Sequence, residues 1–439
     1  MRIWEFDRLG GIASEQFDIN KDGLQFVTTI LGSLWMNEEE LGFDPTITTE
    51  GGQRFVTIKR KGQTERLVIG KLMRRSPCIA GRATTCWKAY REEDPKTTFV
   101  IKDSWQHIEL DEEGDMLREA TEKEVVKMAR HYHHETVVVR GQIDDIRSNV
   151  RGGLNVVEAR NYRLPPSTST VGTPRKGLSK RPANAKRLYS QIGSPLPPSK
   201  RSCSASLKKA GSDALPNRVH RRVILRDYGK PIYAASSRSA LLAALEGCIE
   251  GHESLYKAGF LQRDISVDNL MINEDDENPS WPSFLIDLDL AIKVQRDSAT
   301  GAKGKTGTRA FMAIGALLGE QHSFMHDLES FFWVLFWICI HFVQGKGMGP
   351  TEFDSWNYLG DNELARSKLG TIGSENIFLK TAGDNFTSYY QPLISLVNRL
   401  RRKVFPKNEQ WEKPNPELYS SMREILREGR KDPEVLADG

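Results

Sequence analysis

The pattern of this chain changes from strand-like to helix-like about halfway along it. The first half alternates turn residues with runs of β-branched and aromatic residues, such as Arg54–Ile58 and Thr97–Lys102. These runs predict strands. In the second half, Ser239–Lys257 carries apolar residues at three- and four-residue steps, and His326–Val343 is apolar nearly all round. Both segments predict helices, the second one buried. Strands followed by helices indicate an α+β fold with two lobes rather than an alternating βαβ sheet.

Two further segments carry weaker patterns. Phe26–Leu31 is predicted as a strand because it joins aromatic and β-branched residues. Asp111–Tyr132 is predicted as a charged amphipathic helix, with Leu117, Val125 and Met128 facing inward.

A basic segment, residues 163–217, interrupts the pattern. It holds ten Ser, eight Pro and eleven Lys/Arg against one acidic residue, and Tyr189 is its only aromatic residue. Such a segment cannot bury enough apolar surface to offset its ordering entropy, so a disordered insertion is predicted. Its paired basic residues fit a nuclear-import signal and a solvated linker equally well. The net charge of the whole chain is only +4 and does not favour nucleic-acid binding.

The sequence shows no sign of a membrane or extracellular location. Met1–Asp7 carries charges where a signal peptide has its apolar run, and the longest apolar stretch, Phe331–Val343, is too short to span a bilayer. The five cysteines include no CxxC pair and indicate neither a disulfide framework nor a zinc site. We therefore expect an intracellular protein, cytoplasmic or nuclear, without a membrane partner. Its oligomeric state is not indicated.

The residues best suited to chemistry follow the first predicted helix. Asp264 stands five positions before Asn269, and Asp287 follows a short strand-like pair of residues. A phosphoryl transferase needs one carboxylate to accept a hydroxyl proton, and an amide oxygen with a second carboxylate to hold Mg²⁺. Each piece alone is common in turns, but the ordered set is specific.

This set resembles the H-R-D-x-x-x-x-N and D-F-G motifs of protein kinases. Upstream, Phe99–Lys102 resembles the V-A-I-K strand, whose Lys contacts nucleotide phosphates. Downstream, Gly307–Ile314 resembles the segment that leads into the kinase A-P-E, and His326–Trp333 resembles the start of the buried helix that follows it.

Several of these segments are similar in detail to the fungal-type protein kinase family. They are Lys102–Trp105, Arg263–Ser266, Ile286–Ala291, Gly307–Ile314 and His326–Leu335. The resemblance runs from about residue 60 to about residue 360, apart from the basic segment. It implies a bilobal kinase-like fold with a small β-rich N-lobe and a larger, mostly helical C-lobe. It also implies ATP and Mg²⁺ as cofactors and Ser/Thr hydroxyls of an unidentified protein substrate as acceptors.

The resemblance divides the chain into six parts. They are an N-terminal extension packing with the N-lobe (1–60), the N-lobe (61–162), the basic insertion (163–217), the last N-lobe strand and hinge (218–228), the C-lobe (229–410) and a C-terminal tail (411–439).

The resemblance also implies a role for each site residue. Asp264 is expected to be the catalytic base, and Asn269 and Asp287 to hold Mg²⁺. Lys102 is expected to bind the α/β-phosphates while paired with Glu119, with Glu113 as the alternative partner. The remaining expected roles are ATP binding by Gly81 and Ala83 in the phosphate loop and by Asp227 and Tyr228 at the hinge, and packing of Thr308 beside Asp264. Two structural roles are also expected: Asp327 forms a hydrogen bond with the backbone of the catalytic loop, and Arg263 beside Asp264 can pair with a phosphate on the activation segment.

Five departures from the kinase pattern predict weakened catalysis. Gln262 replaces the His of H-R-D, and Ser266 stands where many Ser/Thr kinases have a Lys that steadies the transferred phosphate. Asp289 replaces the Gly of D-F-G, which costs backbone freedom. The loop Gly81–Cys86 has one Gly where three are expected, so that backbone N–H groups approach phosphate less closely. Gly315 falls where the A-P-E Glu would be, so the salt bridge that braces the C-lobe is expected to be missing.

Three functions therefore stay open. The chain is an active Ser/Thr protein kinase, a pseudokinase that binds nucleotide without efficient transfer, or a small-molecule phosphotransferase. Gly307–Ile314 counts against the third, because small-molecule kinases generally lack a peptide-docking activation segment.

Overall fold

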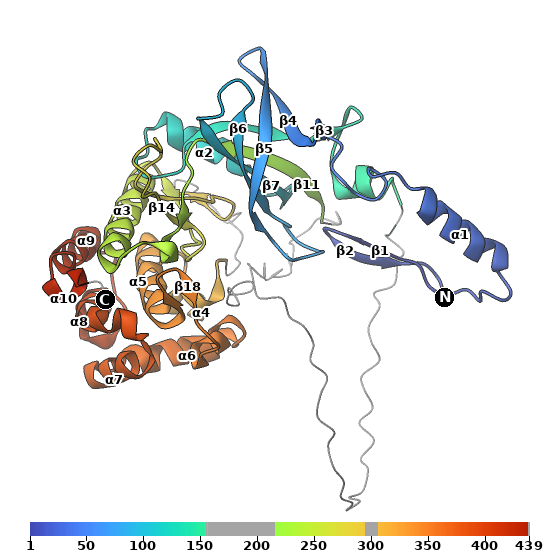
Figure 1. Ribbon diagram of the computed structural model, residues 1–439. Helices are drawn as coiled ribbons and strands as arrows, with labels where there is room; N and C mark the ends of the chain where they lie inside the picture. Colours follow the sequence, from blue (N-terminus) through green and yellow to red (C-terminus); the bar gives the residue numbers. More distant parts are fainter. Residues whose placement is uncertain (155, 157–215, 295–305, 438–439) are drawn as a thin grey trace, which may run out of the picture.

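The computed structural model describes residues 1–154, 156, 216–294 and 306–437, and they form two lobes (Figure 1). The smaller lobe is built on a seven-stranded antiparallel sheet of strand order β3-β4-β5-β6-β7-β11-β8. Its strands are β3 (Ile47–Glu50), β4 (Gln53–Arg60), β5 (Gln63–Arg75), β6 (Thr85–Arg91), β7 (Thr98–His107), β8 (His131–Thr136) and β11 (Arg218–Leu225). Helix α2 (Glu113–Glu122) packs beside β8. The predicted α+β fold with a β-rich N-lobe is confirmed.

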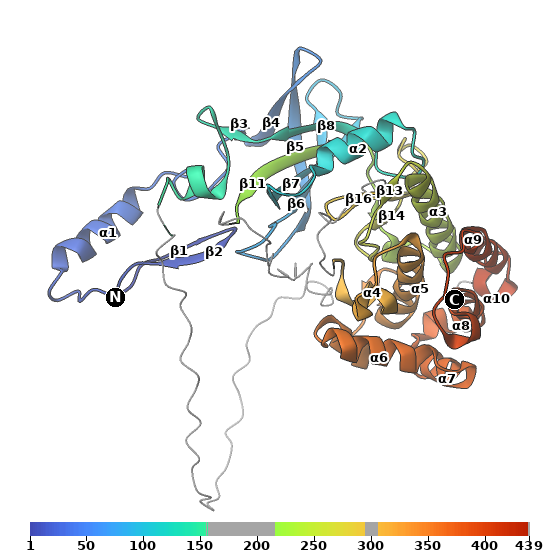
Figure 2. The same ribbon diagram turned by 180° about the vertical axis from the view of Figure 1, so that it is seen from behind.

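The larger lobe is mostly helical and is connected to the first through the end of β11 (Figures 1 and 2). Its helices are α3 (Arg238–Lys257), α4 (Ile314–Leu318), α5 (Phe324–His341), α6 (Asp361–Ile372), α7 (Glu375–Asn385), α8 (Ile394–Val404), α9 (Glu417–Gly429) and α10 (Pro433–Leu436). Its short strands are β12 (Lys230–Pro231), β13 (Phe260–Leu261), β14 (Leu270–Ile272), β15 (Ser283–Leu285), β16 (Ile292–Lys293), β17 (Phe342–Val343) and β18 (Lys346–Gly347). All but one residue of α5 are buried, as its apolar composition predicts.

The remaining elements precede the sheet or follow β8. They are the hairpin β1 (Trp4–Asp7) and β2 (Gly10–Ala13), helix α1 (Gly23–Trp35), the pair β9 (Val138–Val139) and β10 (Gln142–Ile143), and a π-helical turn at Ile146–Val150. Among the described residues, none of the helices has the length and apolar character needed to cross a membrane.

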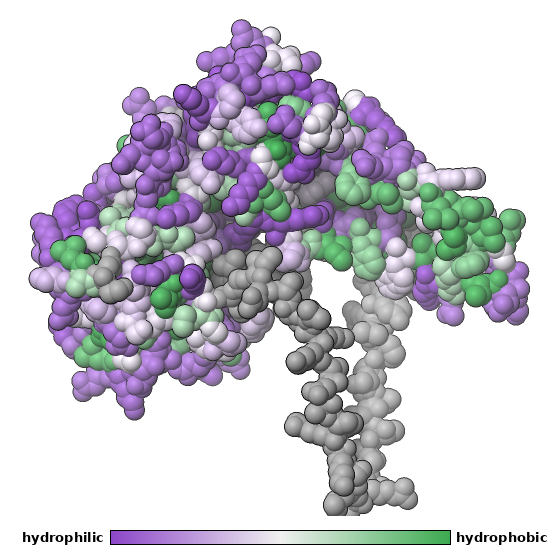
Figure 3. All heavy atoms as spheres, in the orientation of Figure 1, coloured by the Kyte–Doolittle hydropathy of each residue, from purple (hydrophilic) through white to green (hydrophobic). Residues whose placement is uncertain are grey.

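The strand predicted at Phe26–Leu31 is wrong, because these residues lie inside α1. Figures 1 and 2 show α1 standing apart from the sheet, and none of its residues is buried. A segment without a neighbouring strand can satisfy its backbone N–H and C=O groups internally only as a helix, so strand propensity has no effect here. The helix and the segment beside it expose apolar side chains, which form the green area at the right of Figure 3.

The helix predicted over Asp111–Tyr132 is also partly wrong. It ends at Glu122, and Glu124 and Lys127 adopt positive φ angles of 53° each. Val125 and Met128 are buried as predicted, but they lie in an extended connection that bonds to β15 of the larger lobe through Leu285. Their three-residue spacing is typical of a helix, but the segment packs against the larger lobe as a loop.

Two predicted domain boundaries do not match the elements. The boundary at residue 60 falls between β4 and β5, which pair along their whole hairpin, so residues 47–60 belong to the sheet. Residues of the predicted C-terminal tail form α9, which packs on α3 and buries Leu418, Met422 and Leu426. Most of the predicted basic insertion, 163–215, lies outside the described residues.

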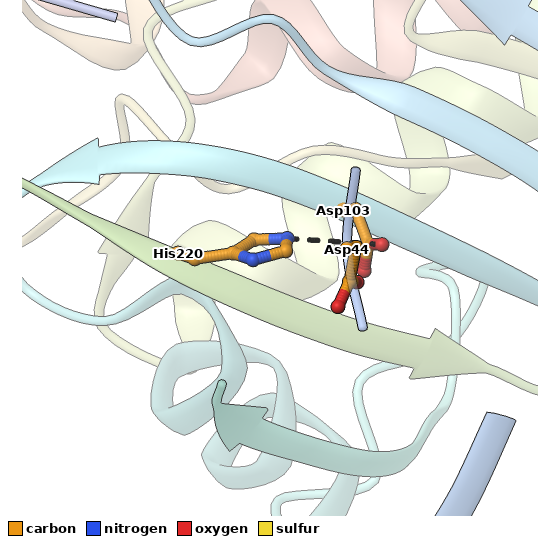
Figure 4. A group of neighbouring side chains, drawn as sticks. All are labelled: Asp44, Asp103 and His220. Atoms are coloured by element: carbon orange, nitrogen blue, oxygen red, sulfur yellow. Dashed lines mark ion pairs between the residues drawn. The ribbon is translucent and has the colours of Figure 1, made fainter. Parts of the chain in front are cut away.

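A buried ion network fixes β7 and β11 against the N-terminal segment. Asp44, Asp103 and His220 face one another there (Figure 4). Arg222 binds the carboxylates of both aspartates, at 2.7 and 2.9 Å. Asp103 and Asp144, lying against the imidazole, outweigh burial and the charge of Arg222 and raise the pKa of His220 to about 9. Arg222 supplies a positive charge to both aspartates, which is the arrangement of a structural ion network.

This network predicts that stability falls as the pH rises. Because the pKa of His220 is raised above its ordinary value, the stabilisation is complete below about pH 6.5 and is lost as the pH rises through about 9. The raised pKa corresponds to a loss on the order of 2–3 kcal/mol in the free energy of unfolding. Chemical unfolding at about pH 6 and about pH 9.5 measures it. His220→Gln is expected to lose less stability than the wild type over this range, and an equal loss would contradict the prediction.

Candidate active site

The candidate site lies between the lobes and begins with Lys102 on β7. Lys102 Nζ lies 2.6 Å from Glu113 Oε2 and 3.2 Å from one carboxylate oxygen of each of Asp287 and Asp289. The Lys102 and Glu113 side chains are almost fully buried. Burial and the charge of Asp289 raise the pKa of Glu113 to about 8, while the surrounding carboxylates outweigh burial and raise the pKa of Lys102.

The predicted pairing of Lys102 with Glu119 is wrong, and the alternative Glu113 is the partner. Glu113 lies on the buried face of α2 together with Met116, Leu117 and Ala120. This i, i+3, i+4, i+7 spacing was the signal in the sequence that could have identified it. Glu119 lies off this face and instead pairs with Lys123 and Lys293.

The two glutamates supply a matched pair of variants. Glu113→Gln is expected to lower nucleotide-dependent activity at least on the order of tenfold, because Lys102 loses its closest carboxylate. Glu119→Gln removes only half-exposed ion pairs and is expected to leave activity near the wild-type value. Transfer rates and melting temperatures of both variants test the assignment, and a larger loss in Glu119→Gln would reverse it.

Asp264 lies in the loop between β13 and β14, and two neighbours hold its carboxylate. Thr308 donates to Asp264 Oδ1 from both its backbone N and its Oγ1, each at 3.0 Å. Asn269 Nδ2 donates to the Asp264 backbone oxygen at 2.8 Å and to Oδ2 at 3.2 Å. The predicted packing of Thr308 beside Asp264 is therefore confirmed.

Asp327 on α5 holds the backbone of the loop that carries Asp264, as predicted. Its Oδ2 accepts a hydrogen bond from the backbone N of Arg263 at 3.2 Å, and the rings of His252 and His322 lie within 2.9 and 2.7 Å of its carboxylate. Burial alone would raise the pKa of Asp327, but the two histidines lower it overall. Gln262, which replaces the kinase His, donates to the Ile286 carbonyl at 3.0 Å and so ties the loop to the residues before Asp287.

An oxygen-rich group faces Asp264 from the segment after β15. Carboxylate oxygens of Glu113, Asp287 and Asp289 lie within 4.8 Å of one another. Asn269 adds an amide whose nitrogen is bonded to Asp264, which leaves its oxygen turned to the other side. Ile286 N bonds to the Asn269 carbonyl at 3.0 Å and keeps the two segments adjacent. Oxygen-only ligands fit Mg²⁺, so Asn269 and Asp287 suit the predicted metal role.

The phosphate loop between β5 and β6 differs from the prediction. Gly81 was expected to offer its N–H to phosphate, but this group donates to the Arg8 carbonyl at 2.9 Å. The Arg8 guanidinium also donates hydrogen bonds to the Cys78 and Ile79 carbonyls, so the N-terminal hairpin is bonded to the loop. Ala83 adopts a φ of 46° beside it, and its contact with ATP stays a prediction. The loop instead directs the side chain of Arg82 toward Asp289.

The hinge residues are held by protein groups. Asp227 accepts hydrogen bonds from Arg130 Nε at 3.0 Å and Nη2 at 2.6 Å. Tyr228 N donates to Ser280 Oγ at 2.9 Å, and its carbonyl accepts from Asn278 at 2.9 Å. Arg130 thus binds the Asp227 carboxylate, and the β14–β15 connection binds the main chain of Tyr228; contact of these residues with ATP stays a prediction.

The segment after Thr308 is braced although the A-P-E Glu is absent. A Cβ atom on Gly315 would lie 2.3 Å from Glu320 Oε2 and 2.6 Å from His326 Nε2, so a larger residue would require these side chains to move. Glu329 on α5 accepts the Ile314 N–H at 2.8 Å, and the buried Lys368 donates to the Met312 carbonyl at 2.7 Å. Gly315 cannot form the A-P-E salt bridge, and two buried side chains hold the segment by hydrogen bonds in its place.

A two-lobed fold with a buried Lys–Glu pair, an Asp264–Asn269 loop and Asp287 defines a protein kinase. Residues 1–339 match the fungal protein kinase family, and the chain belongs to that family. The match begins at residue 1 rather than near residue 60, so it includes the N-terminal extension. The structure is also similar to that of vaccinia related kinase 3, at 10% sequence identity and a TM-score of 0.46, over 90% of this chain and 98% of that one. No curated protein sequence matches the chain.

Proposed function

We propose that this chain is an ATP- and Mg²⁺-dependent protein kinase that transfers the γ-phosphate to Ser or Thr hydroxyls. The observation that carries the proposal is the position of the Asp264 carboxylate. Thr308 holds one of its oxygens and Asn269 the other, and the Asp287 segment runs alongside. This is the arrangement that a base needs beside a metal-bound phosphate.

Each residue would have a defined part in the transfer. Asp264 would orient the acceptor hydroxyl and accept its proton. Lys102, held by Glu113, would bind the α/β-phosphates, and Asn269 and Asp287 would hold the metal ion. Mg²⁺ bound there would neutralise charge on the β- and γ-phosphate oxygens. Catalysis would then come from position and charge rather than from a covalent intermediate.

The acceptor class can be tested directly. The protein is incubated with labelled Mg·ATP and a mixture of basic proteins, and the labelled products are hydrolysed to phosphoamino acids. Label on phosphoserine and phosphothreonine is the expected result. Label on phosphotyrosine would contradict the Ser/Thr assignment, and label only on added small-molecule alcohols would support a small-molecule phosphotransferase.

One observation favours nucleotide binding without transfer as a second candidate. Both cations of the site, Lys102 and Arg82, are paired with Asp289, which stands where kinases have a Gly. If nucleotide cannot separate these pairs, the phosphates will not reach Asp264. A melting temperature raised by ATP, without any labelled product, would support this candidate.

A further inference from the structure

The main chain of the phosphate loop is committed to the smaller lobe. Gly81 N donates to the Arg8 carbonyl, Trp105 N donates to the Arg82 carbonyl at 2.8 Å, and Ser76 N donates to the Thr84 carbonyl at 2.9 Å. Kinase loops of this type usually contact phosphate through backbone N–H groups. Here the N–H of Gly81, the one glycine of the loop, is already bonded within the smaller lobe, so a side chain of the loop is the better candidate for that contact.

The side chain of Arg82 enters the site from this loop. Its Nη1 pairs with Asp289 Oδ2, and the two side chains are 15% and 2% exposed. Burial alone would lower the pKa of Arg82, but the carboxylates of Asp289, Asp287, Asp264 and Glu113 raise it overall. The Asp289 carboxylate lies within 4.8 Å of those of Glu113 and Asp287, so the guanidinium bound to it stands beside the partner of Lys102 and an expected metal ligand.

Asp289 is fixed on its other sides. It pairs with Lys102 at 3.2 Å and accepts a hydrogen bond from Gln106 Nε2. Among the described residues, the Arg82 side chain forms a hydrogen bond with Asp289 alone. A guanidinium has five N–H donors in a planar fork, so the remaining N–H groups can donate hydrogen bonds to phosphate oxygens while Asp289 holds one edge.

The catalytic loop lacks a cation at the corresponding place. Ser266, two residues after Asp264, stands where many Ser/Thr kinases have a Lys. Its hydroxyl is buried and has no hydrogen-bond partner among the described residues. A cation that steadies the γ-phosphate must therefore come from elsewhere, and Arg82 of the smaller lobe enters the site through its ion pair with Asp289.

We propose that Arg82 is a catalytic residue that binds the γ-phosphate of ATP, and that Asp289 is the positioning residue that aims it. The pair would replace both the missing glycine N–H contacts and the missing Lys of the catalytic loop. The inference rests on the proposed function, because it assigns ATP to this site. It also explains why Asp stands at the D-F-G glycine position, because a Gly there would have no side chain to hold the guanidinium.

Binding of ATP and ADP separates this role from a structural one. A non-hydrolysable ATP analogue and ADP, each with Mg²⁺, are titrated into the full chain by calorimetry. Arg82→Ala is expected to lower the affinity for the analogue by a factor at least on the order of tenfold larger than the factor for ADP, because only the analogue carries the γ-phosphate. Asp289→Asn is expected to lower the affinity for the analogue in the same way but by a smaller factor. The variant with both substitutions is expected to lose no more affinity than Arg82→Ala alone. The exposed Arg75 supplies the control, and Arg75→Ala is expected to match the wild type.

Transfer measurements add a second readout. Arg82→Ala is expected to reduce transfer on the order of 10²- to 10³-fold, with partial rescue by added guanidinium ions. Rescue would not occur if Arg82 only maintained the loop. If Arg82→Ala weakens binding of the analogue and of ADP equally and transfers phosphate at the wild-type rate, the role inferred for Arg82 is wrong while the proposed function stands. If the wild type transfers no phosphate, the proposed function fails, and the ratio of analogue to ADP affinity still decides the role of Arg82.

Discussion

Asp264→Asn is expected to reduce phosphate transfer on the order of 10²- to 10⁴-fold while nucleotide binding stays close to the wild-type value. An amide cannot accept the proton of the acceptor hydroxyl. It can still accept hydrogen bonds from Thr308 through its oxygen, so the loop should keep its shape. Single-turnover transfer and calorimetric binding of Mg·ATP measure the two effects separately.

Asp268 provides the matched control in the same loop. Its carboxylate pairs with Arg74 at 2.8 Å, and its side chain is partly exposed. Asp268→Asn is expected to transfer phosphate within about threefold of the wild type, because such a pair contributes little. Equal losses in the two variants would mean that the loop, and not a base at Asp264, controls the rate.

Lys102→Met is expected to abolish both ATP binding and transfer, and to destabilise the fold. The variant leaves Glu113, Asp287 and Asp289 facing one another with Arg82 as the remaining cation among the described residues. Breaking a buried ion pair on one side typically costs about 3–5 kcal/mol. The raised pKa of Glu113 lets this carboxyl take up a proton, which should limit the cost near neutral pH. Since Lys102 itself lowers this pKa, the carboxyl should keep its proton to higher pH in the variant than in the wild type, and the destabilisation should grow as the pH rises past that point.

Lys123 is the control for Lys102. It forms an i, i+4 pair with Glu119 on the surface of α2 and is 46% exposed. Lys123→Met is expected to change neither transfer nor the pH dependence of unfolding. Nucleotide binding retained by Lys102→Met would place the phosphates elsewhere and contradict the assignment.

Much of the fold follows from the sequence because its main elements carry strong periodic patterns. The central strand β7 and the buried helices α3 and α5 form where their apolar residues predict. The failures fall where long-range contacts decide the conformation. Helix α1 has no strand beside it, and residues 123–130 follow the surface of the larger lobe instead of continuing α2.

The site shows the same division. Asp264, Asn269, Thr308 and Asp327 come together as the resemblance to the kinase motifs implies, although Thr308 and Asp327 lie far from Asp264 in the sequence. The choice between Glu113 and Glu119 depends on which face of α2 is buried. Arg82 was missed because its partner, Asp289, is 207 positions away in the sequence. In the sequence, Arg82 and Asp289 each appear only as a departure from the kinase pattern, and their proximity in space shows that they form a pair.

The most direct test of the account is transfer of labelled γ-phosphate from Mg·ATP to a generic basic protein by the full chain, with Asp264→Asn and Lys102→Met measured in parallel. The account predicts labelled protein with the wild type and a loss of labelling in both variants. Absence of transfer by all three proteins, while Mg·ATP still raises the melting temperature of the wild type, would contradict it and identify a nucleotide-binding protein without kinase activity.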